Sequence, residues 1–387
     1  MVESSQKETY RGFEQGPIRP PSEAYSLLIR VSRNCPWNKC SFCPVYKGQR
    51  FSLRSVEHVK RDIDTVARHV SALRKMAGES GRMSREDIDI YMAGVPENER
   101  QAFHAALNWF AAGMESVFLQ DANSLIIKPA DMVAILRHLK HYFPWISRIT
   151  SYARSHTIAR ISDQELKEIA DAGLNRVHIG MESASDEVLK RVAKGTTKAQ
   201  HIKAGKKVVQ CGMQLSEYVM PGLGGRDLST DHATETADAL NQINPHFIRL
   251  RTLAIPSSVS LFEDFRTGRF EKITDYEAAE EILLFLEHLE GITSSIKSDH
   301  ILNLFEEVEG KLPEDKEKMM GVIRAFLGMP VTERMFYQVG RRLGYLRRID
   351  DLANPGVRDE IDKLIRNYGI TPENVEQFND TMMTRFI

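Results

Sequence analysis

Several features are scarce in this sequence. Only 4 of its 387 residues are cysteine, and three of these lie close together, which does not fit the disulfide framework of a secreted protein. No apolar run approaches the roughly 20 residues that a membrane-spanning helix needs, and the N-terminus carries no secretory signal. The sequence has 52 Lys and Arg against 53 Asp and Glu, and this balance argues against a protein that binds nucleic acid mainly through a basic surface. We therefore expect a soluble, cytoplasmic protein with no membrane partner. The charge balance disfavours a nucleic-acid partner such as tRNA, although it leaves room for a local basic groove.

The cysteines that are present form a cluster. Cys35, Cys40 and Cys43 follow the apolar run 25–32 directly, and thiolates this close together can hold iron or zinc. Three thiolates fill three corners of a [4Fe–4S] cluster and leave one iron open, whereas structural zinc usually has four protein ligands. The same spacing occurs in plant-type [2Fe–2S] ferredoxins, with Cys211 as the available fourth ligand, although it lies far along the chain and fits a buried small side chain at a helix end.

Strand-like and helix-like segments alternate along most of the chain, which is typical of βα units with a parallel sheet. Six strands are predicted, at 26–31, 116–120, 148–152, 176–179, 214–220 and 247–252. Helices are predicted between them, at 55–76, 129–142, 162–172, 186–193, 198–210 and 229–243. Crossovers of this length favour parallel pairing.

The same pattern divides the chain. Residues 1–22 are predicted to be an N-terminal extension, 23–270 the alternating α/β unit with a helical insertion at 79–113, and 271–387 a helical C-terminal region. In the last region helical periodicity is predicted at 276–289, 313–327, 332–343 and 359–368.

Functional groups of αβ barrels lie at the carboxyl ends of the strands. The cysteine loop follows the first predicted strand, and polar side chains follow or end the others: Asp121, Asn123, Tyr152, Arg154, Glu182, Ser183, Glu217, Tyr218, Arg249 and Arg251. We expect part of this set to line a pocket for a charged, zwitterionic ligand, because side chains alternate along a strand and some must face the helices.

From residue 25 to residue 263 the chain resembles the radical S-adenosylmethionine (radical SAM) enzymes. The resemblance implies an α/β fold, a partial (β/α)6 barrel, with Cys35, Cys40 and Cys43 as the ligands of a [4Fe–4S] cluster. It also implies that Phe42 lies near the adenine of SAM. The family usually has three residues between the first two cysteines, and this chain has four, at 36–39.

The resemblance extends to further SAM contacts. Asp121 or Asn123 would bind the methionine amino group, Glu182 with Ser183 would bind the ribose, and Lys194 would pair with the methionine carboxylate. The segment 221–225 resembles the family's glycine-rich turn. The same residues have structural interpretations: Asp121 and Asn123 can cap a turn, Glu182 can cap the following helix, and lysines such as Lys194 are usually solvated.

Residues 161–253 look most like a largely uncharacterised branch whose members otherwise carry a cobalamin domain, which we expect this chain to lack. The resemblance implies an anaerobic enzyme that cleaves SAM to a 5′-deoxyadenosyl radical and abstracts hydrogen from an unidentified polar small molecule or peptide. Ferredoxin or flavodoxin is the expected electron donor. The alternative from another class is an iron–sulfur electron carrier or sensor that does not cleave SAM.

One further segment is a candidate for the site. Asp299, His300 and Asn303 lie just past the predicted barrel, where a C-terminal region could close the mouth and contact the substrate or SAM. A lone histidine is more often structural, so His300 keeps both interpretations.

Overall fold

The structure is a computed structural model that describes residues 9–386. Its centre is an eight-stranded sheet in the order β1-β4-β5-β6-β7-β8-β9-β10, parallel except for the last pair. Its strands are β1 (Leu27–Arg30), β4 (Ser116–Gln120), β5 (Arg148–Ala153), β6 (Arg176–Glu182), β7 (Gln214–Val219), β8 (Phe247–Leu250), β9 (Ser295–Lys297) and β10 (Gly310–Lys311). The six predicted strands are confirmed, and the α/β class with a parallel sheet is correct.

Helices cover the outer face of the sheet, as crossovers between parallel strands require. They are α1 (Val56–Ala77), α4 (Pro129–Tyr142), α6 (Asp163–Asp171), α7 (Asp186–Arg191), α8 (Lys198–Gln210), α9 (Ser229–Ile243), α11 (Asp275–Glu287) and α12 (Lys316–Leu327), with the short helices α5 (Ser155–Ile158) and α10 (Leu261–Arg266) between them. Local sequence fixes several starts: Ser162 and Thr274 each form a capping box with the Glu three residues on.

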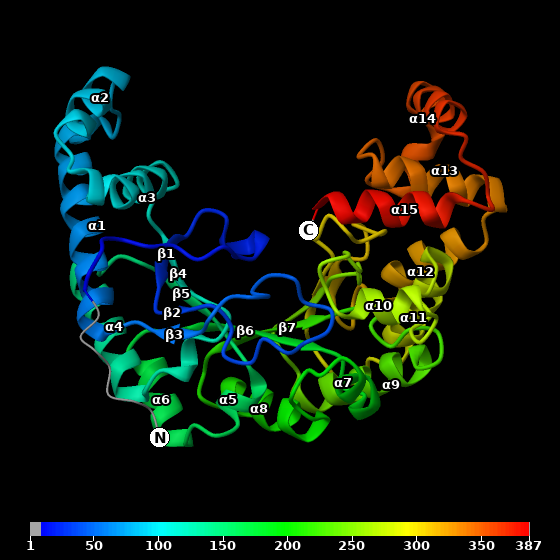
Figure 1. Cartoon of the computed structure of the whole chain (residues 1–387), viewed down its shortest axis with the longest axis horizontal. Helices are drawn as coiled ribbons and strands as arrows, with labels where there is room; N and C mark the ends of the chain where they lie inside the picture. Colours follow the sequence, from blue (N-terminus) through cyan, green and yellow to red (C-terminus); the bar gives the residue numbers. More distant parts are fainter. Residues whose placement is uncertain (1–8, 387) are drawn as a thin grey trace.

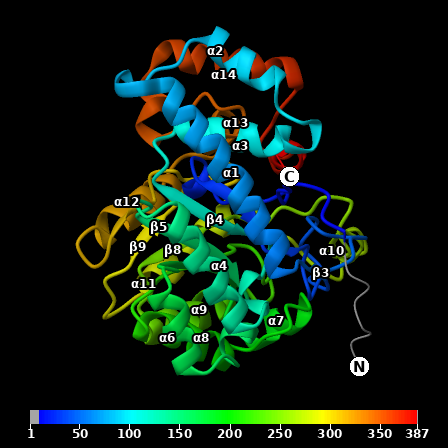
Figure 2. The same ribbon diagram turned by 90° about the vertical axis from the view of Figure 1, so that its left-hand side faces the viewer.

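The sheet curves without closing into a full barrel. Figure 1 shows the helices wrapped around its outer side, with the remaining side flanked by α2 and α3 at one end and by the C-terminal helices at the other. Figure 2 shows α1 running across the molecule on the side nearest the viewer. Single-turn 3-10 helices occur at η1 (Pro21–Glu23), η2 (Gly78–Ser80), η3 (Glu97–Glu99), η4 (Ser124–Ile126), η5 (Ile349–Ala353) and η6 (Thr384–Phe386).

The predicted insertion is helical. It contains α2 (Arg85–Ala93) and α3 (Arg100–Ala111), and α3 packs on α1. Trp109 of α3 is buried and donates its indole N–H to the carbonyl of Ser116 at 2.8 Å, and its ring lies 4.9 Å from that of Phe143. The insertion thus braces the start of β4.

The C-terminal region differs from the sequence prediction. Helices α13 (Val331–Arg342), α14 (Pro355–Tyr368) and α15 (Val375–Met383) are present, but β9 and β10 also lie after residue 270 and extend the sheet beyond the six expected strands. The prediction of a helical region at 271–387 is therefore wrong for these two strands. They are three and two residues long and partly polar, too short for an alternating pattern to register.

Two very short strands flank the cysteine loop. β2 (Ser32–Arg33) and β3 (Ser52–Leu53) pair antiparallel and close the loop at its base. Among the helices of residues 9–386, none is both long and apolar enough to cross a bilayer.

A buried ion pair joins the C-terminal helices to the barrel. Arg342 of α13 donates to Asp275 at the start of α11 at 2.7 Å, and both side chains are less than a tenth exposed. We predict that Arg342→Ala lowers the free energy of unfolding by about 3 kcal/mol, because it leaves a buried carboxylate without its cation. Chemical denaturation measures this. The matched change Arg366→Ala, in an exposed pair with Asp362, should cost less than about 0.5 kcal/mol, and equal costs for the two variants would refute the assignment.

Candidate active site

The loop that carries the cysteines is shaped by local turn chemistry. Asn34 and Asn38 have φ angles of 66° and 46°, in the left-handed region that Asn tolerates better than most residues. The backbone N–H of Asn38 points at Sγ of Cys35, 3.4 Å away, and its side chain donates to the carbonyl of Tyr46 at 2.5 Å. Lys47 donates to the carbonyl of Cys40 at 2.8 Å. These bonds hold the loop's backbone around half-buried, unpaired thiols.

Asp121 anchors this loop to the end of β4. Its buried carboxylate accepts from Arg30 Nε and Nη2 at 2.8 and 2.6 Å, from the Tyr46 hydroxyl at 2.5 Å and from the backbone N–H of Asn34 at 3.2 Å. Both oxygens are therefore engaged by the protein. The geometry gives Asp121 a positioning role, and its contact with the SAM amino group stays a prediction.

The N-terminal segment takes part in the same network. The Gln120 side chain accepts from the backbone N–H of Gly16 at 2.8 Å, and a Cβ on Gly16 would lie 2.5 Å from Asp121 Oδ1. Glu14 accepts from Arg33 at 2.6 Å and forms an ion pair with Arg54 at 2.8 Å. The sequence assigned this extension no role; in the structure it packs against the residues that hold the cysteine loop.

Asn123 also has protein partners. Its side chain donates to the Thr157 hydroxyl at 2.9 Å and accepts from the backbone N–H of Arg154 at 3.0 Å. Arg154 in turn donates to the carbonyl of Lys194 at 2.5 Å. Asn123 therefore positions Arg154, and its contact with SAM stays a prediction.

The long spacer between the first two cysteines has a structural explanation. It contains Trp37, whose indole N–H donates to the carbonyl of Ala193 at 2.7 Å and whose ring lies 4.9 Å from the guanidinium of Arg154. A Cβ at Gly195 would collide with the same ring. The spacer thus docks the cysteine loop onto the turn after α7.

Three of the predicted SAM-binding residues, Phe42, Glu182 and Lys194, meet at this turn. Glu182, with φ of 64°, and Lys194 form an ion pair of 3.2 Å, with side chains 14% and 12% exposed. The ammonium of Lys194 lies 5.7 Å from the centre of the Phe42 ring. A Cβ on Gly180 would collide with the Glu182 carboxylate, so glycine is required beneath it. The solvated interpretation of Lys194 is wrong.

The charges around the thiols oppose each other. Burial raises the pKa of the Cys40 and Cys43 thiols, and the positive charge of Lys194 acts on both in the opposite direction. Arg154 adds to this effect at Cys40. The negative charge of Glu182 reaches Cys43. The structure therefore brings the cysteine loop, Lys194 and Glu182 within one electrostatic environment.

Ser183 lies outside this group. It is fully buried, and its hydroxyl accepts from the backbone N–H of Ser185 at 3.1 Å and lies 2.9 Å from Nδ1 of His232 on α9. These contacts give Ser183 a structural role, and its contact with SAM stays a prediction. The side chain that caps α7 is Ser185, so the capping interpretation of Glu182 is also wrong.

The glycine-rich turn after β7 is held from behind. Oε1 of Glu281 on α11 accepts from the backbone N–H of Gly222 at 2.7 Å, and Oε2 accepts from the Ser229 hydroxyl at 2.5 Å. Burial raises the pKa of Glu281 to about 7 and lowers that of neighbouring His232 to about 4. The two side chains lie 3.6 Å apart, so the turn rests on groups that are neutral near pH 6.

An aromatic layer fills the inner face of the sheet below the site. The layer takes one side chain from each of four neighbouring strands, in the order Phe118, Tyr152, His178 and Tyr218. The ring centres of successive members lie 5.1, 5.7 and 5.8 Å apart. Glu217 lies opposite Ile179 and Ile248 in the strand register, on the face of the sheet that packs against the helices. Burial there raises the pKa of Glu217 well above its ordinary range. Glu217 therefore does not line the mouth with its neighbour.

The segment after β9 reaches the end of β8. Asp299 pairs with Arg249 at 2.5 Å, and the Asn303 side chain bonds the backbone of Thr252 at 2.9 Å and of Leu250 at 2.8 Å. Burial and the charge of Arg251 lower the pKa of His300 to about 4. His300 is thus a neutral group at this edge.

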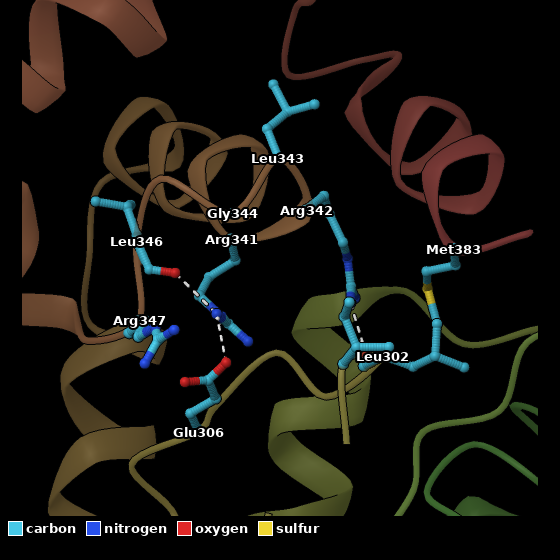
Figure 3. Close-up of a pocket in the computed structure, with 10 residues that line it drawn as sticks. Leu302, Glu306, Arg341, Arg342, Leu343, Gly344, Leu346, Arg347 and Met383 are labelled. Carbon is cyan, nitrogen blue, oxygen red and sulfur yellow. Dashed lines mark hydrogen bonds and ion pairs between the residues drawn. The ribbon is translucent and has the colours of Figure 1, made fainter. Parts of the chain in front are cut away.

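A cavity of about 360 Å³ lies behind this segment. Figure 3 shows Arg341 reaching Glu306 and Arg342 reaching the carbonyl of Leu302. Arg341 also donates to the carbonyls of Asn303 and Leu304. Arg341 bonds through all three of its guanidinium nitrogens and Arg342 through its two terminal nitrogens, so both hold the 299–306 segment against the barrel.

The remaining cysteine lies elsewhere. Cys211 follows α8, ahead of β7, and donates its thiol to the carbonyl of Val208 at 3.1 Å. The start of a parallel strand is the end opposite to the cysteine loop, so Cys211 is not placed as a fourth ligand.

The donor set fits an iron–sulfur cluster. Within residues 9–386, no three His, Cys, Asp or Glu side chains converge closely enough to ligate one metal ion together. A [4Fe–4S] cluster spreads its cysteine ligands over separate irons, and three unpaired thiols in one loop beside two cationic side chains suit that arrangement.

Comparison with known proteins agrees with this chemistry. Residues 94–237, from just before α3 into α9, match the family model of the radical SAM superfamily. This part of the chain is therefore similar to a class of enzymes whose members bind a [4Fe–4S] cluster and SAM. The matched range begins after the cysteine loop, so the loop's assignment depends on the residues described above.

Individual relatives share only part of the chain. The tRNA uridine(34) acetyltransferase of Methanocaldococcus infernus is 25% identical over 122 residues, which are 31% of this chain and 23% of that protein. The 4′-phospho-dehydrooxetanocin synthase of Priestia megaterium is 28% identical over 225 residues, 56% of this chain and 26% of that protein. The chain spans about a quarter of the length of these curated relatives.

Solved structures give a weak likeness. Methylornithine synthase is 14% identical with a TM-score of 0.43, covering 71% of this chain and 66% of that one. Coproporphyrinogen III oxidase from Escherichia coli is 12% identical with a TM-score of 0.42, covering 68% and 50%. Scores this low add nothing to the assignment.

The support of the glycine-rich turn has a testable pH dependence. Glu281 keeps its proton up to about pH 7 in the folded protein, against an ordinary pKa of 4.5, so its contribution to stability is lost as pH rises. We predict that Glu281→Gln gains stability relative to the wild type by about 1.4 kcal/mol per pH unit across this window. Denaturant titrations of both proteins at about pH 5, 6 and 7 measure the difference; His232 titrates in both and cancels. A constant difference would contradict the raised pKa.

Proposed function

We propose that this chain is a radical SAM enzyme that holds a [4Fe–4S] cluster through Cys35, Cys40 and Cys43 and acts on a polar substrate inside the barrel. The observation that carries the proposal is the meeting of the unpaired cysteine loop with the Glu182–Lys194 ion pair at the carboxyl ends of the strands. A reduced cluster held by these cysteines would supply the electron for reductive cleavage of SAM, and hence the radical chemistry that removes hydrogen from the substrate.

The chain's own residues bind and orient the two cofactors. The three thiolates ligate the cluster, and the positive charges of Lys194 and Arg154 favour the thiolate form at Cys40. Lys194 binds the SAM carboxylate, Glu182 binds the ribose hydroxyls, and Phe42 provides an apolar surface for the adenine. Asp121 and Asn123 keep the loop and Arg154 in place.

The partners follow from the chemistry. A one-electron donor such as ferredoxin or flavodoxin must reduce the cluster, and the substrate must fit between the aromatic layer and the cysteine loop. The names of two curated relatives point to different substrates, tRNA for the acetyltransferase and a phosphorylated compound for the synthase. The near-balanced charge of this chain favours a polar small molecule or peptide over nucleic acid.

The first test is anaerobic reconstitution with iron and sulfide, reduction with dithionite, and electron paramagnetic resonance with and without SAM. We expect a [4Fe–4S]⁺ signal that shifts when SAM is added, together with 5′-deoxyadenosine detected by mass spectrometry. Cys40→Ala should abolish the signal and the product, whereas Cys211→Ala should leave both intact. A [2Fe–2S] signal indifferent to SAM would identify an electron carrier or sensor instead.

Lys194 gives a second test. Its ammonium pairs with Glu182 and faces Phe42, so we predict that Lys194→Met weakens SAM binding about tenfold through loss of a charge-assisted hydrogen bond. Equilibrium dialysis with the reconstituted protein measures the dissociation constant. Lys190→Met, at an exposed position on α7, is the control and should bind SAM as the wild type does. Equal affinities for the two variants would remove Lys194 from the SAM site.

A further inference from the structure

Arg251 continues the direction of β8 into the barrel. Its backbone N–H donates to the carbonyl of Val219 at 2.9 Å, so the parallel ladder extends one residue past the end of the strand. Side chains two apart on a strand share a face. Arg249, two residues earlier, donates to the hydroxyl of Ser216 on the inner face, and Arg251 therefore lies on that face as well.

The two arginines differ in what binds them. Arg249 is neutralised by Asp299 at 2.5 Å and also bonds Ser216. The guanidinium of Arg251 is half-buried and makes no hydrogen bond or ion pair with any residue in 9–386. A guanidinium carries five N–H donors and a permanent charge, and removing it from water without a partner is costly. Such a group is suited to an anion that comes from outside the chain.

Neighbouring groups face the same space. The charge of Arg251 acts on Tyr152, Tyr218 and His300, and the two tyrosine rings lie 6.5 Å apart. The buried hydroxyl of Tyr218 interacts with that of Tyr152 and makes no hydrogen bond of standard length with a described residue. A donor that an anion can recruit thus lies close to the free guanidinium. The charge of Glu182 also acts on Tyr152, which connects this space to the site that holds Lys194.

We propose that Arg251 binds an oxyanion of the substrate, a carboxylate or a phosphate, with the Tyr218 hydroxyl as a second donor. Both ligands offer oxygens that a guanidinium fork bonds in pairs. Asp299 is already bound to Arg249 and does not compete. This inference deepens the proposed function and rests on it for the identity of the anion as part of the substrate; the existence of the anion site does not depend on SAM cleavage.

The test uses the reconstituted protein under anaerobic conditions and two probes, inorganic phosphate and acetate. Isothermal titration calorimetry at constant ionic strength should show saturable binding of at least one probe at one site. Arg251→Gln should weaken that binding about tenfold or more, and Tyr218→Phe should weaken it by a smaller factor. Arg266→Gln, at an exposed arginine of α10 that pairs with Glu263, is the matched control and should bind as the wild type does. Tighter binding of phosphate than of acetate, or the reverse, identifies which oxyanion the site prefers.

Two results would overturn the inference: no saturable binding of either probe to the wild type, or equal binding by the wild type and Arg251→Gln. If Arg251→Gln does not fold, Tyr218→Phe decides, because it removes a single hydroxyl. Formation of 5′-deoxyadenosine without substrate is measured on the same samples. If the wild type forms no 5′-deoxyadenosine, the proposed function is refuted. If Arg251→Gln still forms 5′-deoxyadenosine but no longer binds the probe, the result supports a substrate-anion site separate from the cofactors.

Discussion

The position of the cysteine loop depends on one buried carboxylate. Asp121 binds Arg30 of β1 and, on the loop itself, the Asn34 backbone and the Tyr46 hydroxyl, so a single side chain joins two strands of the sheet to both flanks of the three cysteines. Removing one member of a buried ion pair costs about 3–5 kcal/mol, because the other charge is left unpaired. The loop is therefore as fixed as the pairing of β1 with β4, although it contains little regular structure of its own.

A second constraint is electrostatic. Burial disfavours thiolates at Cys40 and Cys43, and Lys194 opposes it while also neutralising Glu182. One ammonium group thus serves both the cysteine loop and the carboxylate on β6. Lys194 lies in the turn after α7, and Trp37 of the cysteine spacer packs on the same turn. The longer spacer in this chain therefore helps to fix the position of the lysine.

The sequence was informative where the signal is local. Six short apolar strands, the helices between them and the cysteine spacing are patterns within ten to twenty residues, and all are found in the structure. Roles that depend on residues distant in the sequence could not be predicted. The sequence around Asp121 does not indicate its contacts with Arg30 and Tyr46. The sequence around Ser183 likewise does not indicate its contact with His232. Strands β9 and β10 were missed because they are very short and stabilised by pairing with β8 and with each other.

The segment before β1 has a consequence for how the chain acquires its fold. Glu23 is fully buried, 3.5 Å from Arg148 and 3.8 Å from His178, and Gly16 is bonded to Gln120. During synthesis this segment leaves the ribosome well before those partners exist. The contact between Glu23 and His178 cannot form until more than 150 later residues have been synthesised, and contacts between residues so far apart in the sequence form slowly. The segment before β1 is thus synthesised early but packs late. The cysteine loop that it supports reaches its final environment only after that packing.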